Sequence, residues 1–169
     1  MMAAQHVLVR GQMLHFLSDP GPEADPAAWQ YFDDGGLWIV DGRIQGAGPW
    51  DAVVAALPPG VRDSAAFHDH RGRLVLPGFV DTHLHYAQAG IIGAYGRQLL
   101  DWLNEYTFPA EARLADLSEA ERAAAFVVER LLAHGTTSAS VFGTVHAHSA
   151  DAFFTVAEAH RLRLLCGKV

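Results

Sequence analysis

The stretch "LVLPGFVDTHLHYAQ", residues 74–88, decides how this chain folds. Its apolar run ends in Asp81, His83 and His85, which occupy alternate positions. Successive side chains of a β-strand point to opposite faces, so these three side chains are expected to share one face. Folds built from β/α units bind ligands at the carboxyl ends of their strands. The stretch therefore predicts a buried strand with a polar, ligand-binding end.

The spacing of His83 and His85 suits metal chelation. Two imidazoles on one face of a strand lie about 6 to 7 Å apart at their Cα atoms. They can converge on one ion with Zn–N bonds of about 2.0 to 2.1 Å. Imidazole nitrogen suits zinc, and a metal ion can make water nucleophilic near neutral pH. The plainer interpretation is a pair of polar residues that closes a buried strand, and the spacing alone leaves both open.

The first third of the chain has the pattern of strands and turns. Residues 5–14 are rich in β-formers, whereas the Pro, Gly and Asp content of residues 18–36 predicts a loop. Asp41-Gly42 separates "LWIV" from "RIQG", and Asp-Gly supplies the positive-φ residues of a type I′ turn. This predicts a β-hairpin. "AFHDHRGRLVLPGFVDTHLHY" is expected to bring another strand, with Pro77-Gly78 as a break before "FVDTHLHY".

Helical spacing begins after residue 98 and then alternates with β-like runs. The predicted order is a helix in "LLDWLNEY", a helix headed by Ser118 and ended by Gly135, a strand in "TTSASVFGTV", a helix beginning at Ser149, and a strand in "LRLLCGKV". Such alternation predicts parallel β/α units and an α/β fold. Two architectures stay open: a small open α/β domain, or the first part of a (β/α)8 barrel, which needs about 250 residues.

Composition limits the possible partners. The chain has 169 residues, a net charge of −7 and 12 basic residues that form no run, so we expect no nucleic-acid or membrane partner. No stretch approaches about 18 uncharged apolar residues, and no secretory signal is evident. The lone Cys166 excludes an intrachain disulfide and is expected to be an inert core thiol. A small-molecule partner and a cytoplasmic location are predicted.

Several segments resemble the metal-dependent amidohydrolase superfamily. "PGFVDTHLH" resembles the first barrel strand of that superfamily, and the upstream strands resemble the small β-sandwich beside its barrel. "QLLDWLNEYTFPAE" (98–111), "GTTSASVFGTVHAHS" and "RLLCGKV" are similar to segments of guanine deaminases. The resemblance implies a partial (β/α)8, TIM-like barrel over residues 74–169, truncated after three β/α units, preceded by part of a β-sandwich over residues 1–73.

The resemblance also implies a site and a reaction. His83 and His85 would be zinc ligands, and His85, Tyr86, Ala87 and Gln88 would form part of a guanine pocket, with the Gln88 amide able to donate to and accept from the purine edge. The reaction would be hydrolysis of guanine to xanthine and ammonia, a step of purine catabolism. The family takes two further His, an Asp and a proton-shuttling Glu from later strands, so no catalytic acid or base is predicted within this chain, and the isolated chain is expected to be inactive.

Other polar residues receive weaker assignments. His146 matches a family histidine that does not bind zinc, and both His146 and His148 are expected in a solvated loop. His68 and His70 are expected in a surface turn. Asp81 is assigned a supporting role, that of orienting a ligand. Trp102 and "YTFP" are expected either to form the wall of the site or to pack in the core.

Two other interpretations stay open. Another amidohydrolase, acting on cytosine, an adenosine derivative or a chlorinated triazine, would share "DTHLH" but lack "WLNEYTFPAE". Alternatively, the chain is a non-catalytic domain whose His-x-His pair binds metal weakly. As a lone chain, an open three-strand parallel segment leaves an unpaired strand edge and an uncovered apolar face, so we expect a homo-oligomer, marginal stability, or a longer natural chain of which this is a portion.

Overall fold

A computed structural model describes residues 4–95 and 98–169. Contacts divide the chain into two compact units, Met1–Pro77 and Gly78–Val169. The domain boundary predicted between residues 73 and 74 stays a prediction. The strand that begins before it, at Ala66, continues past it to Val75. Each unit is described by itself.

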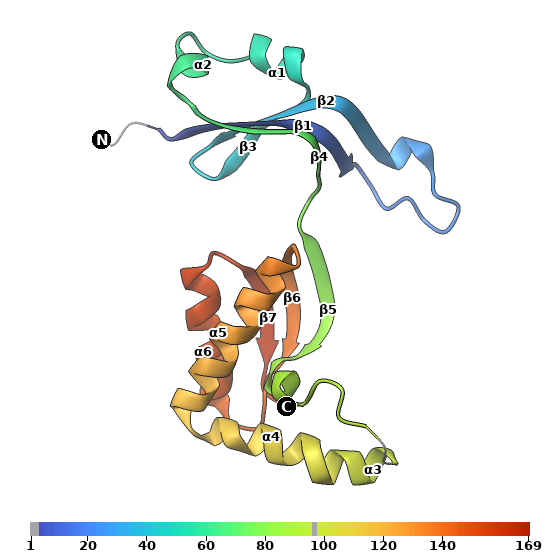
Figure 1. Ribbon diagram of the computed structural model, residues 1–169, viewed down its shortest axis with the longest axis vertical. Helices are drawn as coiled ribbons and strands as arrows, with labels where there is room; N and C mark the ends of the chain where they lie inside the picture. The colour runs from blue at the N-terminus through green and yellow to red at the C-terminus, as the bar shows by residue number, and fades with distance from the viewer. Residues whose placement is uncertain (1–3, 96–97) are drawn as a thin grey trace. The chain divides into compact units, whose positions relative to one another are not determined.

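The first unit is built on a four-stranded mixed sheet in the order β3-β2-β1-β4 (Figure 1). Its strands are β1 (His6–Phe16), β2 (Trp29–Val40), β3 (Arg43–Pro49) and β4 (Ala66–Val75). β2 is antiparallel to both β1 and β3, whereas β4 runs parallel to β1. The loop predicted over 18–36 was too long, because β2 already begins at Trp29. The pairing of Trp29–Phe32 with β1 outweighs the local Asp and Gly content.

The hairpin between β2 and β3 is confirmed. Asp41 and Gly42 both have positive φ, 48° and 77°, as a type I′ turn requires. Further along β2, Gly36 is needed for a different reason. A Cβ on Gly36 would approach the Trp50 ring to 2.8 Å, so the absence of a side chain lets Trp50 close over the sheet.

Short helices complete the first unit. They are η1 (Pro26–Ala28), α1 (Trp50–Ala55) and α2 (Val61–Ser64). α1 contacts β2 and β3. The buried residues Leu8 and Met13 of β1, together with Trp50 and Val53 of α1, supply much of this unit's small apolar core.

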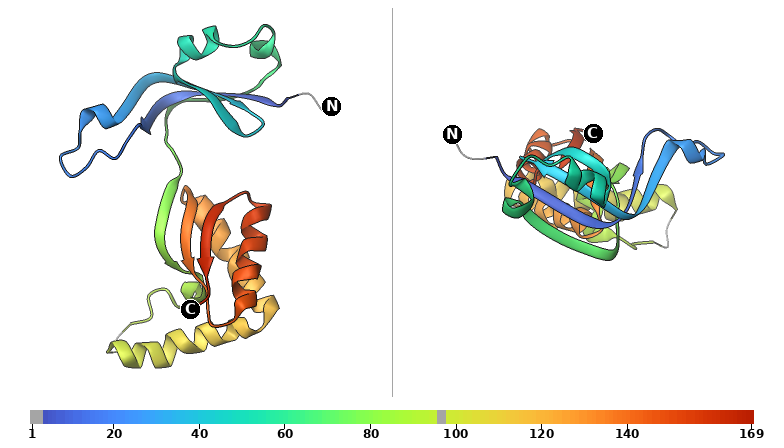
Figure 2. Two further views of the ribbon diagram at one scale, coloured as in Figure 1. Left: turned by 180° about the vertical axis from the view of Figure 1, so that it is seen from behind. Right: turned by 90° about the horizontal axis from the view of Figure 1, so that it is seen from above.

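The second unit carries a parallel three-stranded sheet in the order β5-β6-β7. Its strands are β5 (Phe79–His85), β6 (Thr136–Phe142) and β7 (Arg163–Gly167), and the helices α5 (Leu117–Ala133) and α6 (Ala147–Ala159) cover one face (Figure 2). This is the strand and helix alternation predicted from the sequence, so the α/β assignment is confirmed. The three strands follow one another in chain order, as in the first strands of a barrel.

A chain of short helical turns connects β5 to α5. It comprises η2 (Tyr86–Ile91), α3 (Leu99–Trp102), the π-helical turn η3 (Leu103–Thr107), α4 (Phe108–Ala112) and η4 (Arg113–Ala115). The predicted helix in "LLDWLNEY" therefore exists, and it continues through a π-helical turn into α4. Such turns are uncommon and frequently lie at functional sites.

The caps of the two long helices differ from the prediction. Asp116, not Ser118, caps α5, because its side chain accepts hydrogen bonds from the backbone N–H groups of Ser118 and Glu119. α6 begins at Ala147, two residues before the predicted Ser149. The C-terminal signal of α5 was correct: Gly135 has φ 81° just beyond the helix, as a left-handed C-terminal residue requires.

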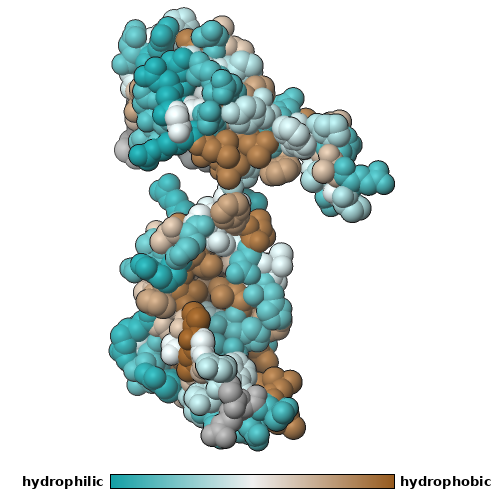
Figure 3. Space-filling view, turned by 45° about the vertical axis from the view of Figure 1, so that its right-hand side comes forward, coloured by the Kyte–Doolittle hydropathy of each residue, from teal (hydrophilic) through white to brown (hydrophobic). Residues whose placement is uncertain are grey.

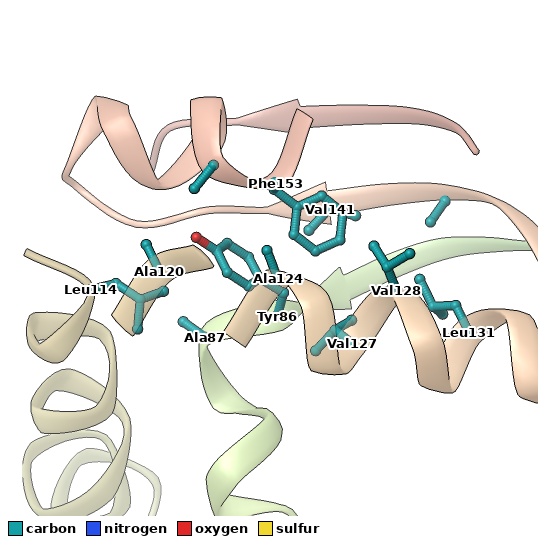
Figure 4. Close-up of a cluster of buried hydrophobic side chains, with 12 residues drawn as sticks. Tyr86, Ala87, Leu114, Ala120, Ala124, Val127, Val128, Leu131, Val141 and Phe153 are labelled. Atoms are coloured by element: carbon teal, nitrogen blue, oxygen red, sulfur yellow. The ribbon is translucent and has the colours of Figure 1, made fainter. Parts of the chain in front are cut away.

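The core of the second unit lies between its sheet and its helices (Figure 4). The rings of Tyr86 and Phe153 pack with centroids 4.7 Å apart, and neither residue is exposed. Val128 of α5 and Val141 of β6 close the cluster from the helix and sheet sides. This packing anchors the residue that immediately follows His85.

Each unit also exposes large apolar side chains (Figure 3). In the parallel sheet these include Val80, which is 67% exposed, and Leu165, which is 73% exposed. Among the described residues, no helix is long and apolar enough to cross a membrane.

Candidate metal and substrate site

His83 and His85 converge at the carboxyl end of β5. The strand is extended through His85, and the two rings are tilted by 50° with centroids 5.1 Å apart. Their Nε2 atoms lie 3.2 Å apart. The sequence-based expectation that these two side chains share one face is therefore confirmed.

The nitrogen spacing fits a shared metal ion. Two nitrogens bound at about 2.0 to 2.1 Å to one tetrahedral zinc would lie roughly 3.3 Å apart. The observed 3.2 Å between the Nε2 atoms is close to that value. Nδ1 of His85 is buried and hydrogen-bonds to no group in the described residues. In metal sites this nitrogen usually donates to an orienting acceptor, and the described residues supply none to His85.

Phe142 holds the histidine pair from the neighbouring strand. It is the β6 partner of His85 in the sheet, and its ring stacks on His85 at 4.7 Å with an interplanar angle of 9°. The same ring contacts His83 at 5.0 Å. Sequence reasoning did not single out Phe142, although its place at the end of a predicted parallel strand was an available signal.

Asp81 lies next to an irregularity in the pairing of β5 with β6. The register between β5 and β6 shifts between Asp81 and Leu84, where three steps along β5 match two along β6. Asp81 pairs with Ala139 and Leu84 pairs with Val141, and both β6 residues belong to the core cluster. The pairing with β6 is therefore irregular at this point, although Asp81 lines the same cavity as both histidines. The Asp81 carboxylate accepts a hydrogen bond from the backbone N–H of His83, at 3.0 Å.

An open cavity of about 540 Å³ adjoins the pair. His83, His85, Gln88 and Trp102 line it together with apolar residues of α5. Trp102 donates its indole N–H to the carbonyl of Ala94 at 2.7 Å, which fastens the wall of the cavity. A cavity of this size accommodates a small heterocycle.

The four predicted pocket residues divide into two groups. His85 and Gln88 line the cavity, whereas Tyr86 and Ala87 are buried. The Tyr86 hydroxyl donates to the carbonyl of Ser149 at 2.7 Å, and burial raises its pKa to about 12. The Tyr86 side chain thus packs in the core and does not line this cavity.

The other histidine pairs have different surroundings. His146 and His148 are half-buried at the start of α6, and Nε2 of His148 lies 2.9 Å from the carbonyl oxygen of Leu114. His68 and His70 are not in a surface turn as predicted but within β4, where they pair with Val9 and Gly11 of β1. The long-range pairing overrides the polar local sequence.

Cys166 is half-buried against the core cluster of the second unit, and burial raises the pKa of its thiol. A raised pKa disfavours the reactive thiolate.

Within residues 4–95 and 98–169, no group of three or more His, Cys, Asp or Glu side chains comes together to hold a metal ion. His83 and His85 thus bring two ring nitrogens together without a third such ligand among the described residues.

Comparisons with known proteins agree with this geometry. Residues 74–169 match the model of the amidohydrolase family. The chain is 43% identical to guanine deaminase of Escherichia coli over 100% of its own length and 38% of that protein. It is 42% identical to a probable guanine deaminase of Deinococcus radiodurans, covering 96% of this chain and 36% of that protein.

A solved structure gives the same result in three dimensions. The E. coli guanine deaminase superimposes with a TM-score of 0.86 at 42% identity, covering 95% of this chain and 37% of that one. The chain thus spans less than two-fifths of the length of these relatives. The match to the family model covers more than half of the chain, including the strand that bears His83 and His85. This chain belongs to the amidohydrolase family.

Proposed function

We propose that the protein, in its full natural length, hydrolyses guanine to xanthine and ammonia. One observation carries the proposal: similarity to guanine deaminases extends along the whole chain, through the strand on which two imidazole nitrogens converge to 3.2 Å. The similarity favours the guanine deaminase assignment over other amidohydrolases because it includes "WLNEYTFPAE". The first residue of this segment is Trp102, which lines the cavity.

His83 and His85 would hold a zinc ion through their Nε2 atoms. Zinc, when bound, supplies Lewis acidity that makes water acidic near neutral pH. The Phe142 ring contacts the rings of both histidines and so keeps them in place. The hydrogen bond from the backbone N–H of His83 to the Asp81 carboxylate fixes β5 at His83. Imidazole donors suit zinc, and two of them leave room for further ligands and for substrate.

His85, Tyr86, Ala87 and Gln88 would form one side of the guanine pocket. Gln88 lines the cavity and can contact the purine edge with its amide. Tyr86 and Ala87 act as positioning residues, because their burial in the core fixes the backbone between the histidine and the amide. The pocket is thereby held by packing that does not depend on the substrate.

The overall reaction adds water across one carbon–nitrogen bond. The water oxygen bonds to the ring carbon that bears the exocyclic amine, the bond from that carbon to the amine breaks, and the amine leaves as ammonia. A carboxylate must carry the proton to the departing nitrogen. We expect this carboxylate and the remaining metal ligands outside residues 1–169, so the isolated chain should be inactive.

Ammonia release from guanine tests the proposal. The full-length protein loaded with zinc should release ammonia from guanine and not from cytosine, adenosine or a chlorinated triazine, whereas residues 1–169 alone should release none. Hydrolysis of one of the other substrates in preference to guanine would favour a different amidohydrolase. Weak zinc binding without ammonia from any substrate would favour a non-catalytic domain. The expected cytoplasmic location and homo-oligomeric state stay predictions.

A further inference from the structure

Glu111 and Gln88 form a hydrogen bond that the assignments above do not use. Nε2 of Gln88 donates to Oε1 of Glu111 at 3.2 Å, in a partly buried position. We propose that Glu111 is a positioning residue that fixes the orientation of the Gln88 amide toward the purine. This inference rests on the proposed guanine deaminase function and assigns part of its specificity.

Glu111 sits on a segment that is anchored at both ends. It belongs to α4, which contacts η2, the turn that bears Gln88. On one side, Trp102 is hydrogen-bonded to the carbonyl of Ala94, and on the other, Leu114 is buried in the core cluster. Arg113, two residues beyond Glu111, forms its ion pair with Glu119. The carboxylate is therefore held facing Gln88 by the fold.

Gln88 is anchored in a similar way. It follows Tyr86 and Ala87, which are 0% and 8% exposed, so its backbone leaves the core at a fixed point (Figure 4). Its side chain lines the cavity beside His83 and His85. Rotation of its terminal amide decides whether the nitrogen or the oxygen of Gln88 faces Glu111.

The chemistry of the pair fixes that rotation. An ionised carboxylate only accepts hydrogen bonds, whereas an amide has one accepting oxygen and one donating NH2 group. Glu111 therefore selects the orientation in which the NH2 group faces it. The amide oxygen of Gln88 is left as a fixed acceptor for an N–H donor on the purine edge. A hydrogen bond to a charged group is stronger than one between neutral groups, which makes the bias effective.

The test uses the full-length protein and five variants. Glu111→Ala removes the orienting group, and Glu111→Gln replaces it with a group that accepts or donates and so orients less. Gln88→Glu places two carboxylates together, and the double variant with Glu111→Gln restores an N–H to carboxylate pair with its polarity reversed. Glu121→Gln, at an exposed carboxylate on α5, is the control for loss of charge.

Steady-state kinetics with guanine and calorimetric binding of xanthine are the measurements. We expect Glu111→Ala to raise KM and the xanthine Kd roughly tenfold with little change in kcat. Glu111→Gln should have a smaller effect, the double swap should bind better than Gln88→Glu alone, and Glu121→Gln should match the wild type. Rescue by the swap is a result that a merely structural role of Glu111 does not produce.

The contrary outcomes are distinct. If the wild type releases ammonia from guanine and Glu111→Ala keeps its KM within about twofold, this inference fails and the proposed function stands. If Glu111→Ala loses kcat and thermal stability and the swap restores nothing, Glu111 is structural and the inference fails. If the wild type releases no ammonia from guanine, the proposed function and this inference fall together.

Discussion

Two strands of this molecule carry the same His-x-His pattern, but the two pairs of histidine rings are arranged differently. On β4, the rings of His68 and His70 are 6.3 Å apart and nearly parallel, at 8°. On β5, the rings of His83 and His85 are 5.1 Å apart and tilted by 50°, which brings their Nε2 atoms together. Parallel rings keep their nitrogens apart, whereas tilted rings converge. His-x-His spacing alone therefore does not decide whether two ring nitrogens converge.

The surroundings explain the difference. The β5 pair rests on Phe142, and the residue after His85 is locked into the core through Tyr86. The β4 pair lies next to an exposed ion pair between Asp69 and Arg71. A catalytic or metal site needs side chains that are held by packing beneath them, and only the first of these two pairs is held in that way.

The largest expected effect separates the two pairs directly. His83→Ala or His85→Ala removes one of the two proposed zinc ligands and should lower ammonia release from guanine by roughly a thousandfold or more. His68→Ala and His70→Ala should leave the rate within about twofold of the wild type. Zinc content measured on the same samples should follow the rates. Equal losses from both strands would remove the contrast between them.

The core beneath the β5 pair gives the next largest effect. Phe153→Ala deletes a fully buried ring against Tyr86 and should cost about 3 to 5 kcal/mol of unfolding free energy. Its neighbour Phe154 is 43% exposed on the same helix, so Phe154→Ala is the matched control and should cost less than about 1 kcal/mol. Denaturant unfolding measures both. Similar costs would mean that the core does not lie where it is described.

The start of β5 provides a smaller effect. A Cβ on Gly78 would overlap the side chain of Thr137 on β6, so Gly78→Ala should destabilise the unit by about 1 to 3 kcal/mol. A Cβ on Gly90 would meet no atom within 4 Å, so Gly90→Ala is the control. If Gly78→Ala unfolds at the wild-type denaturant concentration, the close approach of β5 and β6 at this point is wrong.

The smallest effect concerns the β4 side of the comparison. Side-chain and backbone hydrogen bonds from Arg71 lower the pKa of Asp69 to about 2. Because the folded-state pKa lies below the ordinary value of about 3.9, the interaction stabilises the fold above that pH and is lost as pH falls through about 2. Arg71→Ala should raise the pKa of Asp69 part of the way back, as followed by NMR titration of the carboxyl. An unchanged pKa would show that the pair does not persist.

Much of the fold followed from local patterns in the sequence. The Asp41-Gly42 turn, the C-terminal Gly135 of α5 and the alternation of strands with helices each have a local cause, and each is confirmed. The early start of β2 and the pairing of β4 with β1 depend on residues far apart in the chain. Local composition does not report such contacts. The start of β2 was therefore assigned to a loop, and His68 and His70 of β4 were assigned to a turn.

The candidate site divides in the same way. The shared face of His83 and His85 follows from strand periodicity, whereas the stacking of Phe142 and the register shift at Asp81 arise from the pairing of β5 with β6. The hydrogen bond between Gln88 and Glu111 joins residues 23 positions apart. These contacts are decided by how separate elements meet, which no single stretch of sequence contains.

The most direct test of the account is the position of zinc in crystals of the full-length protein, located by anomalous scattering at the zinc edge. The account predicts one peak about 2.0 to 2.1 Å from the Nε2 atoms of both His83 and His85. A zinc ion bound at His68 and His70 instead, or a β5 pair that binds none when zinc is supplied, would contradict it.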